Sequence, residues 1–181
     1  MVRWKWCYFL TKDNLIRRNW LGSPSCYFCS EDETIEHLYF TCPIARVIWG
    51  VIGASLGACN TPNSLSQYKN WIQRWLPNGG LIHTFGLASI CWAIWKRCND
   101  ACFNNKALRS PFEVLTYACA LMTFWAGLYG SEMQGKILEG VKALLSCVQW
   151  SASQQRRSPP KILLEQAQEQ APEEETSEDE V

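Results

Sequence analysis

Residues 26–42 read Cys-Tyr-Phe-Cys-Ser-Glu-Asp-Glu-Thr-Ile-Glu-His-Leu-Tyr-Phe-Thr-Cys, and no other stretch of the chain carries its chemistry so plainly. The spacing is Cys-x2-Cys-x7-His-x4-Cys, which makes Cys26, Cys29, His37 and Cys42 the candidate donors. Three thiolates and one imidazole suit a closed tetrahedral zinc site, which holds structure because no position is left open for water. The alternative is a set of ordinary buried cysteines with a hydrogen-bonded histidine. A short segment with four acidic residues has little apolar core in which to bury these cysteines. We therefore predict a zinc site.

The charge of the chain is unevenly distributed. The formal net charge of the 181 residues is zero, but residues 1–111 carry +6, residues 112–164 carry +2 and residues 165–181 carry −8. A basic body with an acidic tail can accompany nucleic-acid binding. The hydrophobic fraction of 48% and the ten tryptophans supply material for a core.

The ten cysteines and the N-terminus bear on the compartment. The basic start of the chain is followed by no long apolar run, because the polar residues 11–14 arrive too early for a secretory signal. We therefore expect an intracellular protein, nuclear or cytoplasmic, whose thiols are free or bound to metal.

Apolar residues recur at helical spacing, and strand patterns are nearly absent, so we predict a mainly α fold. The expected helices are 11–20, one beginning near Ser30 with a Ser30/Glu33 capping box, one after Pro43, 87–103, 112–129 and 136–150. The predicted organisation is a zinc module over 1–56, a linker over 57–80 with a short helix near 68–75, a helical region over 81–150 and a disordered acidic tail over 151–181.

Other short motifs surround the candidate ligands in a fixed order. They are Leu10–Leu15, Arg18-Asn19-Trp20, Glu33-Thr34, His37–Phe40, Cys42–Arg46 and Trp49. With the ligands, they resemble the reverse-transcriptase zinc-binding domain in the C-terminal part of the polyproteins of plant non-LTR (LINE-type) retrotransposons. The resemblance covers residues 4–52 and implies that Met1 lies inside a domain that normally begins earlier. Residues 92–103 are similar to the tryptophan-rich helix that follows in these polyproteins, except that Cys98 separates Arg97 from Asn99.

The sequence lacks the motifs of the enzymes that accompany this domain. No Asp-Asp pair in an apolar setting is present for polymerase magnesium, and the four aspartates are scattered. Cys91, Cys98, Cys102 and His83 suggest no catalytic set, because a buried helical stripe explains the cysteines more simply. We expect an accessory module of a retrotransposon-derived protein and no enzyme.

Two functions remain open. The first is contact with RNA or DNA, since basic side chains neutralise phosphates and aromatic rings stack on bases. The second is a zinc-stapled structural or protein-interaction remnant that self-associates through its apolar helices. A membrane span over residues 114–130 is disfavoured, because polar side chains interrupt this short uncharged run. The candidate nucleic-acid contacts are Arg3, Lys5, Lys12, Arg17, Arg18 and Trp20.

Overall fold

The computed structural model describes residues 10–157, and this part of the chain is helical, as predicted. It contains no strand, and the only bridge between extended residues joins Ser25 to Asp32. The elements are α1 (Lys12–Ile16), the π-helix η2 (His37–Thr41), α2 (Pro43–Ser55), α3 (Leu65–Trp75), α4 (Leu81–Asn104), α5 (Pro111–Ala126) and α6 (Ser131–Arg157).

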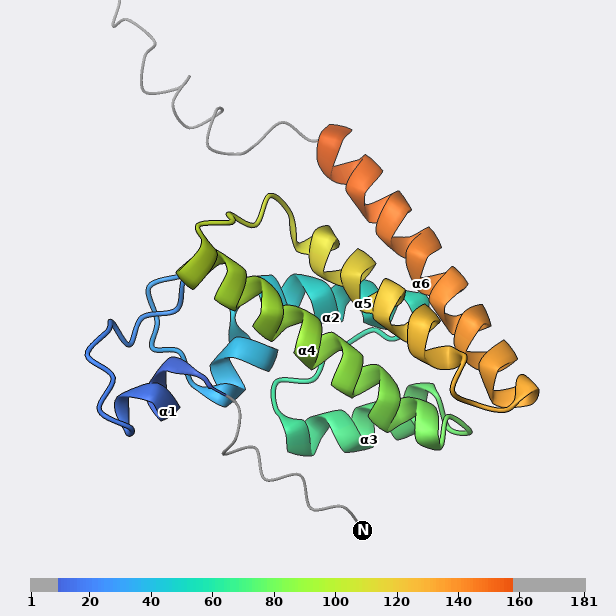
Figure 1. The fold of residues 1–181 in the computed structure, drawn as a ribbon. Coiled ribbons are helices and arrows are strands. Elements are labelled where there is room, and N and C mark those ends of the chain that lie inside the picture. Colours follow the sequence, from blue (N-terminus) through green and yellow to red (C-terminus); the bar gives the residue numbers. More distant parts are fainter. Residues whose placement is uncertain (1–9, 158–181) are drawn as a thin grey trace, which may run out of the picture.

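The helices form a bundle, and α4 crosses the middle of the view in Figure 1. Helices α5 and α6 pack against each other, α5 also packs on α4, and α2 lies against both α5 and α6. Helix α1 and the loop that follows it lie at the end of the molecule reached by the C-terminal end of α4 (Figure 1). None of the described helices is long and apolar enough to cross a membrane.

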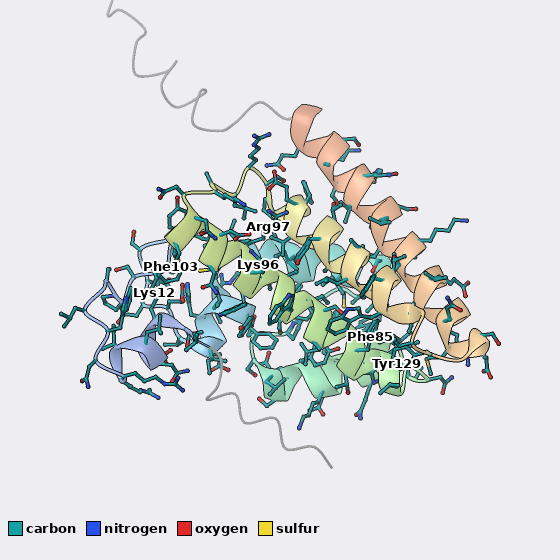
Figure 2. The ribbon with its side chains drawn as sticks, viewed as in Figure 1. Lys12, Phe85, Lys96, Arg97, Phe103 and Tyr129 are labelled. Atoms are coloured by element: carbon teal, nitrogen blue, oxygen red, sulfur yellow. The ribbon has the colours of Figure 1, made fainter. Side chains whose placement is uncertain are left out.

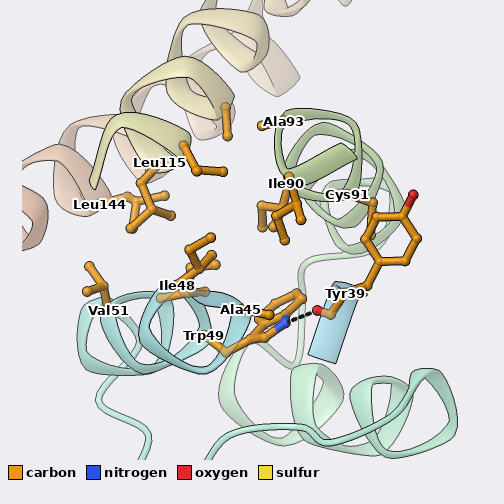
Figure 3. Packing of buried hydrophobic residues seen from close by; sticks show 14 of the residues in the cluster. Tyr39, Ala45, Ile48, Trp49, Val51, Ile90, Cys91, Ala93, Leu115 and Leu144 are labelled. Carbon is orange, nitrogen blue, oxygen red and sulfur yellow. Dashed lines mark hydrogen bonds between the residues drawn. The ribbon is translucent and has the colours of Figure 1, made fainter. Parts of the chain in front are cut away.

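One cluster of buried apolar side chains joins the segment that carries the candidate ligands to the later helices. Trp49 of α2 lies within it: its ring stacks on Phe40 at 5.6 Å between centroids, and its Nε1 donates to the Tyr39 carbonyl at 2.7 Å (Figure 3). This contact fixes η2 against α2. The same cluster includes Ile48, Ile90, Cys91, Leu115 and Leu144.

Local signals in the sequence set several helix ends. Ser110 caps α5 by accepting a hydrogen bond from the Phe112 amide at 3.3 Å, and Pro111 occupies the first turn. Asn105, with φ 51°, ends α4 in the left-handed conformation that asparagine tolerates. Pro43 begins α2, as predicted.

The first two predicted helices need correction. The helix predicted over 11–20 ends at Ile16, because Asn19 takes a φ of 64° and turns the chain. The four-residue spacing of Ile16 and Trp20 predicts that both side chains pack inward, but Ile16 is 39% exposed. The predicted Ser30/Glu33 capping box is also wrong. The helical turn begins at Ile35, and Thr34 caps it by accepting from the His37 amide at 3.1 Å.

The segment predicted as a linker packs into the core. Tyr68, Trp71 and Ile72 are buried on one face of α3, since their i, i+3, i+4 spacing forms a helical stripe. Trp71 Nε1 also donates to the Asn60 carbonyl at 2.7 Å. The short helix expected near 68–75 is therefore confirmed, but 57–80 does more than connect two parts.

Helix α6 is longer than the predicted 136–150, so the beginning of the predicted tail is wrong. Residues 151–157 continue the helix because they contain no breaker, and the first proline beyond α6 is Pro159. The rest of the tail, residues 158–181, lies outside the described residues.

Candidate metal centre

A tight hairpin presents the first two candidate donors. The Cys26 amide donates to the Glu31 carbonyl at 2.7 Å, and the Glu33 amide donates to the Pro24 carbonyl at 2.9 Å. These bonds close the loop that carries Cys26 and Cys29. The paired cysteines therefore lie on a short turn whose two sides are joined by backbone hydrogen bonds.

The other two donors come from η2 and its end. The Cys42 amide donates to the His37 carbonyl at 2.8 Å, which is the i→i+5 bond of a π-turn. Cys42 then takes φ −54° and ψ 139°, so the chain leaves the helix at this residue before α2 begins. Pro43 favours this break because a residue before proline avoids the helical conformation.

The four donor atoms converge. One ligand atom from each of Cys26, Cys29, His37 and Cys42 lies within 4.8 Å of all the others. The Sγ atoms of Cys26 and Cys42 are 3.9 Å apart, and Cys29 Sγ is 3.2 Å from His37 Nε2. A tetrahedron with Zn–S bonds of about 2.3 Å has sulfur–sulfur separations of about 3.8 Å, and sulfur–nitrogen separations of about 3.6 Å. These two pairs are close to the ideal separations, and all donor pairs lie within about 1 Å of them or closer, so the donors can close around a zinc ion.

A neighbouring carboxylate orients the histidine. His37 Nδ1 lies 3.1 Å from Glu31 Oε2 and donates to it when the imidazole is neutral. This places the lone pair of the ring on Nε2, the nitrogen nearest Cys29. Carboxylate–histidine contacts of this kind fix the tautomer of a metal-binding imidazole.

The site is shielded from water. Cys26, His37 and Cys42 are buried, and Cys29 is half-buried. The hydrogen bond to Cys42 and burial raise the pKa of Cys26, while the contact with Cys26 lowers the pKa of Cys42. Burial also raises the pKa of Cys29. A divalent cation therefore has to displace protons to bind here. Four protein donors leave no open coordination position, so such a site is structural.

Sequence reasoning missed the role of Glu33, which is 3% exposed. Its Oε1 accepts from the Lys12 amide at 3.2 Å, and its Oε2 accepts from Cys98 Sγ at 3.1 Å. Burial, followed by the charge of Glu33, raises the pKa of the Cys98 thiol, so the thiol keeps its proton and donates. Glu33 thereby links residues 24–42 (the metal segment) to α1 and α4. No local pattern signals a contact across 65 residues of sequence.

The candidate nucleic-acid residues differ in their surroundings. Arg17 and Arg18 are exposed, and Arg17 lies 3.8 Å from Asp13. Lys12 is half-buried, and its ammonium donates to the Ser25 carbonyl, which supports the hairpin. Trp20 is half-buried against Phe103 of α4. The remaining candidates, Arg3 and Lys5, lie outside the described residues.

A paired-cysteine hairpin completed by a helical histidine and a cysteine defines a Cys3His metal site of the zinc-finger type. Residues 2–49 match the family described as zinc-binding in reverse transcriptase. The match contains all four donors and confirms the resemblance found in the sequence. The plant LINE origin and the N-terminal truncation stay predictions. No match was found among the curated proteins or the solved structures.

Proposed function

We propose that this chain is a non-catalytic, zinc-binding accessory module of a retrotransposon-derived protein. The convergence of four soft donors within 4.8 Å, in a segment that matches a zinc-binding family, carries the proposal. Thiolates and imidazole favour Zn²⁺ over Mg²⁺ or Ca²⁺, which prefer oxygen ligands.

The proposed role of zinc is to staple the hairpin to η2. The short helix α1 and the loop around the paired cysteines have few buried apolar side chains of their own. A structural zinc ion supplies apparent binding energy on the order of 10 kcal/mol, which becomes folding energy when the site forms only in the folded state.

Metal content tests this proposal. Purified full-length protein should contain about one zinc ion per chain, and Cys26→Ser should lose it. Cys59→Ser is the matched control, because Cys59 is an exposed cysteine outside the cluster. Equal zinc in the Cys26 and Cys59 variants would overturn the assignment.

The second part of the proposal is contact with RNA or DNA through basic and aromatic residues near the N-terminus. They are Arg3, Lys5, Lys12, Arg17, Arg18 and Trp20. The exposed guanidinium groups of Arg17 and Arg18 support it, because they can neutralise phosphates. The hairpin itself is a poor phosphate site, since Glu31, Asp32 and Glu36 are exposed there.

Filter binding of single-stranded RNA across a salt series tests the nucleic-acid contact. The zinc-loaded protein should bind with an affinity that falls as salt rises, and Arg17→Gln/Arg18→Gln should weaken binding at every salt concentration. Lys69→Gln, an exposed change on α3, controls for the loss of positive charge. Absent or salt-insensitive binding by the folded zinc form would refute this part.

A protein-interaction module with no nucleic-acid affinity is the second candidate. Phe124 and Leu128, at the end of α5, are 78% and 82% exposed, and Trp150 of α6 is 65% exposed. Such side chains favour association. Sedimentation would distinguish protein interaction from nucleic-acid contact, because a tight oligomer without nucleic-acid binding supports only the protein-interaction candidate.

A further inference from the structure

A groove runs along α5, and residues of α4, α6 and the loop before α5 also line it. Its volume is about 790 Å³, and its walls include Arg97, Arg109, Phe112, Glu113, Tyr117 and Gln155. Two guanidinium groups and one carboxylate face the same space. The groove therefore carries a net charge of about +1 when these groups are ionised.

The guanidinium of Arg97 is held against an aromatic ring, and its Nε has no acceptor in the part of the chain that the structure describes. It lies over the Tyr117 ring, 5.4 Å from the centroid, and its Nε is buried without a hydrogen-bond partner among the described residues. The preceding side chain, Lys96, is paired with Asp100 at 2.5 Å. Buried donors are normally satisfied, so the unpaired Nε leaves Arg97 with unused hydrogen-bonding capacity beside the groove.

Helix α4 extends from the groove to the end of the molecule that carries the candidate metal donors (Figure 1). Phe103, near the C-terminal end of α4, is 58% exposed and meets the Trp20 ring at 6.5 Å between centroids. Figure 2 shows Phe103 beside Lys12 at this end, with Arg97 further along α4. The loop that follows α4 carries two exposed basic residues, Lys106 and Arg109, and leads directly into the groove.

We infer that this groove binds one phosphodiester of a single-stranded nucleic acid whose neighbouring bases stack near Trp20 and Phe103. The inference rests on the proposed nucleic-acid function and adds a second contact to it. Guanidinium groups bind phosphate oxygens through paired N–H donors, and exposed aromatic rings accept bases without sequence preference.

Glu113 limits the positive charge of the groove. It opposes the two arginines, so the groove has an excess of about one positive charge, which one phosphodiester neutralises. Phosphomonoesters, such as a free nucleotide or a phosphorylated peptide, carry about −1.5 to −2 at neutral pH. Part of that charge would stay unneutralised in the groove and would face Glu113.

The test is fluorescence anisotropy of a labelled single-stranded RNA on the zinc-loaded full chain, measured across a salt series. Arg97→Gln/Arg109→Gln should weaken binding roughly tenfold, as expected for lost charge-assisted hydrogen bonds. The slope of log affinity against log salt should fall by about 0.7, because one phosphate contact is removed. Glu113→Gln should act in the opposite direction and tighten binding.

Two controls keep the outcomes distinct. Lys69→Gln should match wild type, and Arg109→Gln alone tests the groove if the Arg97 change disturbs packing, because Arg109 is exposed. Normal wild-type binding that neither groove change weakens would overturn the groove site and leave the proposed function standing. Absence of wild-type binding would overturn both the groove site and the proposed nucleic-acid contact, while the zinc proposal has its own test. Equal competition by a mononucleotide, which carries a phosphomonoester, would refute the phosphodiester assignment.

Discussion

Glu31 and Glu36 are both exposed acids close to the candidate metal ligands, but only Glu31 contacts the His37 ring. Glu31 accepts from His37 Nδ1 at 3.1 Å, whereas Glu36 has no such contact with the imidazole. The difference is a matter of direction, because the hairpin points Glu31 toward the histidine ring. The sequence alone presents both simply as acids of the loop.

Glu31→Gln should lower the zinc affinity, because an amide orients the imidazole less strongly than a carboxylate. Partners of this kind typically change metal affinity about 10- to 100-fold. Competition with a chromophoric chelator would measure it. Glu36→Gln is the control and should leave the affinity unchanged; a similar loss in both variants would point to general charge near the site instead.

Glu33 has a role at the same scale but of another kind, since it is buried and bonded to α1 and α4. Glu33→Ala should lower the free energy of unfolding by about 1–3 kcal/mol, because the Lys12 amide and the Cys98 thiol lose their acceptor. Urea unfolding of the zinc-loaded protein would measure this loss. Unchanged stability with normal zinc content would show that the buried carboxylate is dispensable.

At the scale of the elements, periodicity predicted the long helices well. The stripe on α4 is confirmed: Ile90, Cys91, Ile94 and Cys98 are buried. The starts and ends were less predictable where tertiary contacts compete with local signals. Glu33 illustrates this, because its bonds to α1 and α4 remove it from the capping box that its spacing suggests.

Helix α6 offers a matched pair of leucines. Leu144 is buried against the core, whereas Leu138 on the same helix is 37% exposed. Leu144→Ala should destabilise the protein by about 2–5 kcal/mol through lost burial and a cavity, and Leu138→Ala should cost much less. Denaturant unfolding would measure both, and equal losses would contradict the packing of α6 described here.

At the scale of the whole molecule, the metal segment and the later helices share one apolar cluster. The sequence predicted the ligand set from spacing, and the structure brings those four residues together. The sequence did not reveal that residues 57–80 pack into the core, or that Cys98 of α4 bonds to Glu33. Such contacts depend on how distant helices dock, which spacing along the chain does not encode.

The uneven distribution of buried side chains predicts a graded response to chelation, because residues 10–36 contribute few of them. Removing zinc should speed hydrogen exchange of amides in residues 12–42, because few backbone bonds hold the hairpin. The amides of α5 and α6 should remain protected, since their mutual packing involves no metal donor. Loss of protection throughout the chain would show instead that zinc is required for the whole fold.

X-ray absorption at the zinc edge would show directly whether Cys26, Cys29, His37 and Cys42 bind one zinc ion. The purified full-length protein should show three sulfur neighbours at about 2.3 Å and one nitrogen at about 2.0–2.1 Å. His37→Ala should remove the imidazole signal while leaving the sulfur shell of any zinc that remains. A first shell of oxygen and nitrogen without sulfur would show that these cysteines do not bind the zinc.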